Sequence, residues 1–458
     1  MRVVICGAGQ VGFGIAERLA SEQNDVSIID RDPRRIQMVT EQLDVRGVVG
    51  HGSHPDVLSR AGVESADMLI AVTLSDEANM VACLVGHALF NVPTKVARIR
   101  AQNYLAPEWR DLIARDHLPI DVVISPEIEV GEMVLRRLSL PGAIDTVSFA
   151  DGAVVAVGVV CGEDCPVVDT PLKQLTQLFP EVNAVVVAVS RRGKTLVPRS
   201  EDRLQQGDIA YFVSPADQVQ RALSIFGHDE VPGQRIVIAG GGNIGFYVAS
   251  ELEVRNPMAR VKLIESSKDR AQTVAELLGR TVVLHGDALD RTILDEASVS
   301  EADVMIALTN DDRINILSCQ LAKQIGAGRI LALLNEQGYA AFARGLGIDA
   351  HVNPRQITVS KVLQHVRRGR IRGVHALLDG SGEMIEAEAL ETSPLVGKPL
   401  RDVELPDGLR LGAVVRNGQA MIPRGDFVVR AHDRVVLFAL PERIKRVEQL
   451  FRVALEFF

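Results

Sequence analysis

The chain has 458 residues and a formal net charge of −9 at pH 7, from 50 basic and 59 acidic side chains. This acidic balance and the low aromatic content of 4% argue against a dedicated nucleic-acid-binding protein, which would present a basic face or base-stacking rings. No apolar stretch approaches the roughly 18 residues of a membrane span, and the few cysteines fit a reducing compartment. We therefore expect a cytoplasmic protein of about three domains.

The N-terminal segment predicts a nucleotide-binding domain. An apolar run, Val3–Cys6, is followed by Gly7-x-Gly9-x-x-Gly12 and then by a helical pattern. In a Rossmann fold the first glycine permits a tight turn, the second lets the backbone approach a pyrophosphate, and the third allows close helix–strand packing. Asp30 ends the next predicted strand, where a carboxylate reaches ribose hydroxyls and favours NAD over NADP. The alternative is a decayed site whose glycines serve only the turn.

Polar residues mark the ends of two later predicted strands. Thr73 closes the strand that begins near residue 68, and its hydroxyl either contacts ribose or phosphate or caps the following helix. Arg98 and Arg100 end the predicted strand 96–100, at the edge where such sheets bind ligands. We expect these two arginines to clamp phosphate.

The rest of the first half predicts a small α+β module. Short apolar strands alternate with turn signals such as Asp151-Gly152 and Arg192-Gly193, and a helical segment lies near 215–226. The apolar strand Ala184–Val189 is suited either to burial inside its own module or to packing against another one. Both interpretations remain open.

The same order of features recurs in the second half. The segment 235–246 repeats 2–13, including the glycine motif Gly240-x-Gly242-x-x-Gly245. Glu265 takes the place of Asp30, and Thr309 takes the place of Thr73. This companion spacing predicts an internal duplication.

The two halves differ at one position of chemical interest. Leu333 and Asn335 stand where the first half has Arg98 and Arg100. We hypothesise that the first site tolerates more phosphate charge, as in ATP or ADP, and that the second favours a dinucleotide.

The duplication predicts four subdomains in an α/β fold. We expect residues 1–136 and 233–370 to form Rossmann-like domains, each with a doubly wound parallel sheet. Residues 137–228 and 371–458 are expected to form small α+β domains, and a polar link, 227–234, joins the halves.

Catalytic and metal-binding patterns are missing from the sequence. No tyrosine is followed four residues later by lysine, and there is no Walker lysine motif or Gly-x-Ser-x-Gly elbow. Cys161 and Cys165 have no second Cys or His cluster to complete a zinc site. We expect nucleotide pockets without catalytic residues and without a metal.

The paired glycine motifs, the two acids, the Thr73 and Thr309 blocks and the small tail modules resemble the TrkA family. Members of that family are bacterial cytosolic subunits built from two regulator-of-potassium-conductance (RCK) units, and the resemblance covers essentially the whole chain. It implies a non-enzymatic, NAD(H)- and adenine-nucleotide-binding regulator. Such a regulator assembles with itself as a dimer or tetramer under a Trk-type potassium-translocating membrane subunit, peripheral on the inner face of the plasma membrane.

The resemblance also implies nucleotide contacts. In the first half they are Gly7, Ala8, Gly9, Gln10, Val11, Gly12, Asp30, Thr73, Leu74 and Arg98. In the second half they are Gly240, Gly241, Gly242, Asn243, Ile244, Gly245, Glu265, Thr309 and Asn310. The apolar Leu333 puts tight polyphosphate binding at the second site in doubt.

Two other functions remain alternatives at this stage. An NAD-dependent oxidoreductase of unknown substrate would turn over its nicotinamide cofactor. A regulator of a potassium efflux antiporter would keep every site residue and change only the membrane partner.

Overall fold

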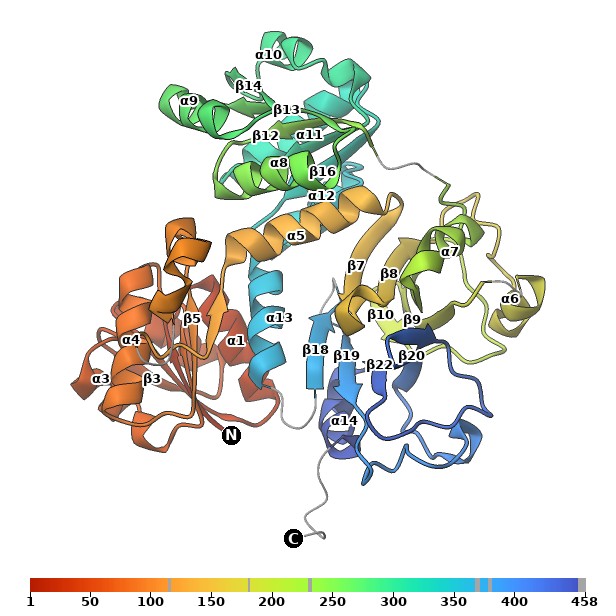
Figure 1. Cartoon of the computed structure of the whole chain (residues 1–458), viewed down its shortest axis with the longest axis horizontal. Helices are drawn as coiled ribbons and strands as arrows, with labels where there is room; N and C mark the ends of the chain where they lie inside the picture. The colour runs from red at the N-terminus through yellow and green to blue at the C-terminus, as the bar shows by residue number, and fades with distance from the viewer. Residues whose placement is uncertain (114–116, 180–181, 230–232, 367–370, 378–380, 452–458) are drawn as a thin grey trace. The chain divides into compact units, whose positions relative to one another are not determined.

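The computed structural model describes residues 1–113, 117–179, 182–229, 233–366, 371–377 and 381–451 (Figure 1). The chain divides into two compact units: the first contains Met1–Val130 and Asn353–Val366, and the second contains Gly131–Val352 and Arg367–Phe458. Residues 230–232 of the predicted link lie outside the described residues. Within the described part of the chain, no helix is both long enough and apolar enough to cross a membrane.

The first unit is built around a parallel sheet of order β3-β2-β1-β4-β5-β6. Its strands are β1 (Arg2–Cys6), β2 (Asp25–Asp30), β3 (Arg46–Val49), β4 (Met68–Ala71), β5 (Thr94–Arg98) and β6 (Val122–Ile124). Strand β1 is apolar on both faces: Val3 and Ile5 belong to one buried cluster, and Val4 and Cys6 to another on the opposite face. Covering both faces is what a parallel sheet requires.

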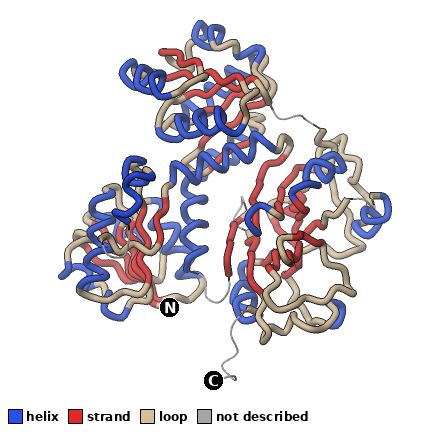
Figure 2. The backbone as a smooth tube through the Cα atoms, viewed as in Figure 1, coloured by secondary structure: helices blue, strands red, loops and turns tan. Residues whose placement is uncertain are grey.

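The connecting helices of this unit follow each strand in turn (Figure 2). They are α1 (Gln10–Ser21), α2 (Pro33–Gln42), α3 (Pro55–Arg60) and α4 (Asp76–Ala88). Because the strand order reverses between β1 and β4, the carboxyl ends of these strands flank a topological switch point. Parallel sheets bind their ligands in the crevice at such a point.

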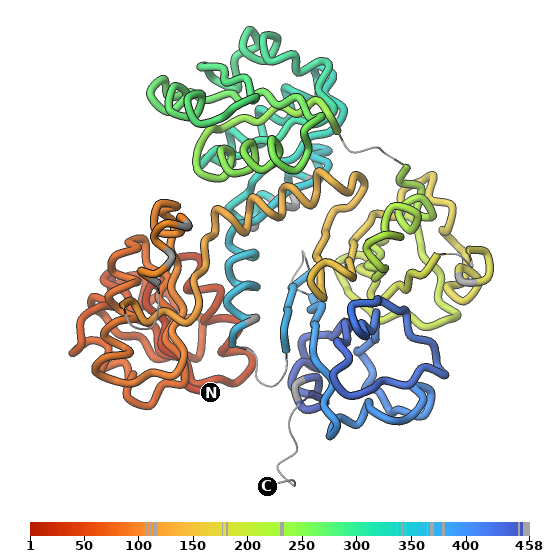
Figure 3. Tube along the Cα trace, in the orientation of Figure 1, coloured from red at the N-terminus to blue at the C-terminus, as the bar shows by residue number. Residues whose placement is uncertain are grey.

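A helix from the second half completes the core of the first unit. Helix α13 (Pro354–Val366) packs on α1 (Figure 3). Its Val362, Leu363 and Val366 are buried in the cluster that includes Val3 and Ile5. The close approach needs a small residue on α1, because a Cβ on Gly14 would lie 3.1 Å from Val359 Cγ2.

The second unit contains the second parallel sheet, of order β14-β13-β12-β15-β16-β17. Its strands are β12 (Arg235–Ala239), β13 (Arg260–Glu265), β14 (Val282–His285), β15 (Val304–Ala307), β16 (Arg329–Leu333) and β17 (Ala350–Val352). Its helices are α8 (Asn243–Arg255), α9 (Lys268–Leu277), α10 (Arg291–Glu296), α11 (Asp312–Ile325) and α12 (Gln337–Gly345). The strand order is that of the first sheet, as the duplication predicts.

Helix α8 of the second sheet is contacted by residues of α5 (Pro126–Ser139), a helix of the first half. Glu132 accepts a hydrogen bond from Tyr247 Oη at 2.7 Å and pairs with Arg255. A Cβ on Gly131 would lie 2.3 Å from Tyr247 Cδ1, so the tyrosine ring lies directly against the glycine. Each parallel-sheet domain thus carries a helix from the other repeat.

The two small modules are five-stranded antiparallel sheets of matching order, β10-β9-β11-β8-β7 and β21-β20-β22-β19-β18. The first has β7 (Ala143–Phe149), β8 (Val154–Val160), β9 (Val185–Arg191), β10 (Lys194–Leu196) and β11 (Ile209–Pro215), with α6 (Leu172–Leu178) and α7 (Val219–Ile225). The second has β18 (Ile371–Ala376), β19 (Glu383–Glu388), β20 (Leu409–Arg416), β21 (Gln419–Met421) and β22 (Arg434–Ala439), with α14 (Ile444–Leu450).

The central strands of the modules are buried on both faces, which reconciles the two sequence interpretations. Val186 and Val189 of β9 lie in the core of their own module, whereas Val187 and Ala188 lie in a second cluster. That cluster also contains Val436 and Phe438 of β22, from the other module. One face of each strand serves its own module and the other joins the two modules. The predicted fold class, two Rossmann-like domains each followed by a small α+β domain, is confirmed.

The glycine turns should be intolerant of any side chain. A Cβ on Gly12 would lie 1.8 Å from the Gly7 carbonyl oxygen, and a Cβ on Gly245 would lie 1.9 Å from that of Gly240. We expect Gly12→Ala to lower the opening free energy of the first parallel-sheet domain by about 3 kcal/mol or more, because the backbone itself must move. Hydrogen exchange of peptides from 1–30 should report this loss.

Gly245→Ala provides the matched variant, since it should weaken only peptides from 235–265. Gly338→Ala, where a Cβ meets nothing within 4 Å, should leave exchange unchanged or slower. Equal protection in Gly12→Ala and the parent chain would contradict the argument.

Candidate functional site

The first glycine loop lies between β1 and α1 at the switch point of the sheet. Gly7 has a φ of +110°, a conformation that side-chain-bearing residues rarely adopt. Helix α1 begins at Gln10 with Gly9 as its N-cap, so the N–H groups of its first turn have no intrahelical acceptors and face the switch point. These N–H groups form the kind of anion site that binds phosphate.

The predicted acid lies against this loop. The Asp30 carboxylate accepts hydrogen bonds from the N–H of Ala8 at 2.7 Å and from the N–H of Asp32 at 2.9 Å. In the second repeat, Glu265 accepts from the N–H of Gly241 at 2.7 Å and from that of Ser267 at 2.8 Å. Two carboxylates of different length therefore occupy the same place relative to their loops.

Each glycine loop also has an arginine beside it that the sequence did not predict as a site residue. Arg35 of α2 lies 3.8 Å from Asp30, and its counterpart Arg270 donates from Nε to the carbonyl oxygen of Gly241 at 2.7 Å. Arg270 also lies over the Phe246 ring, 5.9 Å from the ring centroid. The signal was present in the sequence, because each arginine follows its acid by five residues in both repeats.

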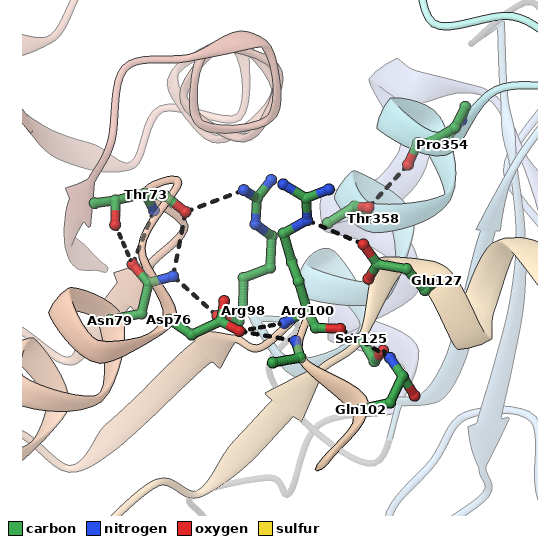
Figure 4. Close-up of polar contacts among 11 residues, drawn as sticks. Thr73, Asp76, Asn79, Arg98, Arg100, Gln102, Ser125, Glu127, Pro354 and Thr358 are labelled. Carbon is green, nitrogen blue, oxygen red and sulfur yellow. Dashed lines mark hydrogen bonds and ion pairs between the residues drawn. The ribbon is translucent and has the colours of Figure 1, made fainter. Parts of the chain in front are cut away.

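Thr73 and Thr309 hold the loops at the ends of β4 and β15. Thr73 donates its hydroxyl to Asn79 Oδ1 at 2.7 Å, and its backbone N–H donates to the same oxygen at 2.9 Å. Asn79 Nδ2 donates to the carbonyl oxygens of Thr73 and Arg98 (Figure 4). Thr309 and Asn315 repeat these contacts at 2.7 and 2.9 Å. The hydroxyl oxygens also accept from backbone N–H groups, Thr73 from Ser75 at 3.4 Å and Thr309 from Asp311 at 3.3 Å. Each threonine hydroxyl therefore donates and accepts within its own loop.

Two arginines converge beside this loop in the first unit. Arg98 donates to the carbonyl oxygen of Thr73 at 3.0 Å, and Arg100 pairs with Glu127 at 2.9 Å (Figure 4). Arg98 is only 9% exposed, and its Nε has no hydrogen-bond partner among the described residues. Burial lowers the pKa of Arg98, and the neighbouring Arg100 lowers it further. A partly compensated positive charge thus lies beside the switch point.

The predicted strand 96–100 ends two residues early, at Arg98. The reason is Asp76, whose Oδ2 accepts from the N–H groups of Arg100 and Ala101 and so turns the chain away from the sheet.

The second unit has no equivalent cation pair at this position. Leu333 is 3% exposed at the end of β16, and Asn335 is bound to Asp312 through its N–H and its side-chain amide. Asp312 caps the strand as Asp76 does in the first unit. The asymmetry noted in the sequence is therefore present in the fold.

The sequence-predicted residues of each half gather at one sheet edge. In the first half these are Gly7, Ala8, Gly9, Gln10, Val11 and Gly12 between β1 and α1, Asp30 at the end of β2, Thr73 and Leu74 after β4, and Arg98 at the end of β5. In the second half they are Gly240, Gly241, Gly242, Asn243, Ile244 and Gly245, with Glu265, Thr309 and Asn310. Leu74 is 74% exposed beside this edge, which leaves it open to a ligand.

The side chains beside the glycine loops are hydrogen-bonded within the fold. The carboxylates of Asp30 and Glu265 accept hydrogen bonds from backbone N–H groups. His51, which lies after β3, is hydrogen-bonded to the hydroxyl of Ser53. Among the residues that the structure describes, no group of three or more His, Cys, Asp or Glu side chains is arranged to hold a metal ion. The five cysteines are buried free thiols, and burial raises the pKa of Cys83 to about 12.

The fold and these loops define a tandem pair of RCK-type nucleotide-binding units. Comparison with known proteins gives the family: the TrkA-N domain matches residues 3–126 and 236–354, and the TrkA-C domain matches 156–227 and 384–452. The chain is 77% identical, over the full length of both proteins, to the Trk system potassium uptake protein TrkA of Azorhizobium caulinodans. It therefore belongs to the TrkA family of Trk potassium uptake proteins.

Solved structures agree on the fold. The RCK domain of GsuK covers 98% of this chain and 94% of its own length, with a TM-score of 0.61 and 19% sequence identity. The GsuK channel bound to NAD covers 98% of this chain and 78% of its own, with a TM-score of 0.61 and 18% identity.

The loop after β4 should depend on the Asn79 amide more than on the Thr73 hydroxyl. Asn79→Ala removes the acceptor of the Thr73 N–H and the amide donor to the carbonyl of Arg98, while the Thr73 carbonyl keeps only its hydrogen bond from Arg98; the expected cost is about 2–4 kcal/mol. Thr73→Val removes the short hydroxyl contact with Asn79 and the longer ones with Ser75 but keeps the Asn79 amide, at about 1 kcal/mol. Hydrogen exchange of peptides from 68–100 measures both, with Thr73→Ser as the control that keeps the hydroxyl. A larger effect of Thr73→Val than of Asn79→Ala would contradict this assignment.

Proposed function

We propose that this chain is a nucleotide-binding regulatory subunit that assembles with itself under a membrane potassium uptake channel or transporter of the Trk type and gates it. The observation that carries the proposal is the duplicated glycine loop with its carboxylate acceptor: Asp30 accepts from the N–H of Ala8 and Glu265 from that of Gly241, both at 2.7 Å. Such a protein acts by binding. We propose that it lies on the inner face of the plasma membrane through its protein partner and is not an enzyme.

The first ligand we propose is NAD(H), at both sites. Asp30 and Glu265 are acceptors for ribose hydroxyls, and the first-turn N–H groups of α1 and α8 face the pyrophosphate position. The GsuK channel, which shares this fold and has been solved bound to NAD, supports this choice.

We also propose that the four subdomains span 1–136, 137–228, 233–370 and 371–458.

The first site is proposed to accept ATP or ADP as well. Arg98 and Arg100 supply two guanidinium groups there, and one of them has an Nε without a partner among the described residues. A triphosphate adds negative charge at the place where burial has already weakened the hydration of Arg98. Leu333 offers nothing comparable in the second repeat.

Regulation by such ligands needs only unequal affinity for two states of the assembly. A ratio of about 10- to 100-fold shifts the equilibrium by roughly 1.4–2.7 kcal/mol. A nucleotide at the switch point contacts the loops after β1, β2 and β4 together, so its binding is coupled to the arrangement of all three loops.

The charge at position 98 should decide nucleotide preference at the first site. Arg98→Leu installs the residue of the second repeat, and we expect ATP affinity to fall about tenfold or more while NADH affinity changes about threefold or less. Calorimetric titration of the full chain, with the second site disabled by Glu265→Ala, measures this difference.

Arg98→Lys keeps the charge and should lie between the parent and Arg98→Leu, because lysine cannot donate two parallel hydrogen bonds. Equal losses of ATP and NADH affinity in Arg98→Leu would indicate a general collapse of the loop and contradict the proposal.

The gating role is tested with native membranes. A tagged chain should co-purify with a potassium-transporting membrane protein, and adding NADH or ATP to that complex in vesicles should change the potassium flux. Recovery of an efflux antiporter instead would show that the membrane partner is not an uptake protein. Oxidation of NADH in the presence of a small metabolite would show that the chain is an oxidoreductase and contradict the regulator proposal. Loss of the flux response in Asp30→Ala plus Glu265→Ala links the effect to these sites.

A further inference from the structure

The first small module contains a cavity, and the second module carries larger side chains at several of the aligned positions. The cavity has a volume of about 230 Å³. Its walls are mostly apolar residues of α6, of β9 and β11 and of α7, and three polar residues, Ser200, Lys173 and Arg410, also line it. An apolar cavity of about 150 Å³ is large enough for benzene, so this one accommodates a somewhat longer molecule.

The second small module, as the other copy of the repeat, shows which residues stand at the corresponding positions. The strands correspond by the bidentate pairs Arg191–Asp208 and Arg416–Asp433, which occupy matching places in the two modules. By this register Ala184 and Val186 of the first module stand where the second has Leu409 and Leu411, which are 6% and 8% exposed.

The same register places Ala222 of α7 opposite Val447 of α14, which is fully buried. Phe212, which replaces Leu437, restores only part of the volume lost at the other positions. The first module also has a complete helix, α6, where the second has a single turn, Leu400–Asp402. The space is therefore a difference between two copies of one fold.

The two cations that line the cavity differ in how their charge is compensated. Lys173 pairs with Glu201 at 2.8 Å. Arg410 extends from β20 of the second module and donates to the carbonyl oxygen of Pro198. No carboxylate of the described residues pairs with it, and burial lowers its pKa. An anionic group beside Arg410 would compensate this charge.

We propose that this cavity is a ligand site for a small apolar molecule that carries one anionic group, of the size of a medium-chain carboxylic acid. The chain of the ligand lies against Leu175, Phe179 and Phe212, and its anionic group is bound by Arg410. The site is separate from the nucleotide sites and does not depend on the function proposed above.

The test is calorimetric titration of the full chain with sodium octanoate and, as the neutral probe, 1-octanol. We expect one saturable octanoate site and binding of octanol about tenfold weaker, the loss of one charge-assisted hydrogen bond. The absence of saturable binding by octanoate, or equal affinity for octanol, overturns the proposal.

Two variants separate this site from unspecific binding. Ala184→Leu with Val186→Leu installs the residues of the second module and should abolish octanoate binding without lowering the thermal midpoint. Arg410→Met should reduce octanoate affinity about tenfold and leave octanol unchanged. Arg430→Met, an exposed arginine of the same module, is the matched control and should have no effect.

NADH affinity should be unchanged in all three variants. If octanoate binds as tightly to the Ala184→Leu, Val186→Leu chain as to the parent, the ligand lies elsewhere and the proposal fails. If that double variant unfolds, the Arg410→Met result decides between the two outcomes.

Discussion

The contact between the third glycine of each motif and the carbonyl of the first is the constraint on which both parallel-sheet domains depend. Because a Cβ on Gly12 or Gly245 would lie less than 2 Å from that carbonyl oxygen, only hydrogen fits. This contact sets how closely α1 and α8 approach their sheets. It thereby fixes where the first-turn N–H groups point and how far away the acid on the neighbouring strand lies. Asp30 and Glu265 reach the same place because the loops, and not the acids, define it.

Much of this architecture follows from the sequence because repetition reveals it. The glycine motifs, the acids and the threonines recur at matched spacing, and every one of them lies at the expected sheet edge. The roles of Thr73 and Thr309 could not be predicted from the sequence. Their hydroxyls bond to an asparagine six residues later, and a pattern of spacing does not show whether a hydroxyl faces a ligand or its own loop. Arg35 and Arg270 were missed because they lie on a helix, one turn beyond the motif.

The small modules were the hardest to predict, for a physical reason. Central strands such as β8 and β9 carry long apolar runs, so period-two alternation does not separate the face that closes a module from the face that joins two modules. The cavity of the first module is likewise invisible in either copy alone. It depends on differences of a few carbon atoms between aligned positions, and it requires the register that the Arg191–Asp208 and Arg416–Asp433 pairs provide.

Helices α5 and α13 each pack on the parallel-sheet domain of the other repeat. The small and the large contacting residue are reversed between these two contacts. On α1 the small residue is Gly14, and its partner on α13 is Val359, whereas on α8 the large residue is Tyr247, and its partner on α5 is Gly131. Gly14 and Tyr247 are equivalent positions of the repeat, as are Gly131 and Val359. If each helix packed on its own repeat, glycine would face glycine in one domain and tyrosine would collide with valine in the other. The contacting residues are therefore complementary only when α13 packs on α1 and α5 packs on α8, so neither of these two helices could replace the other.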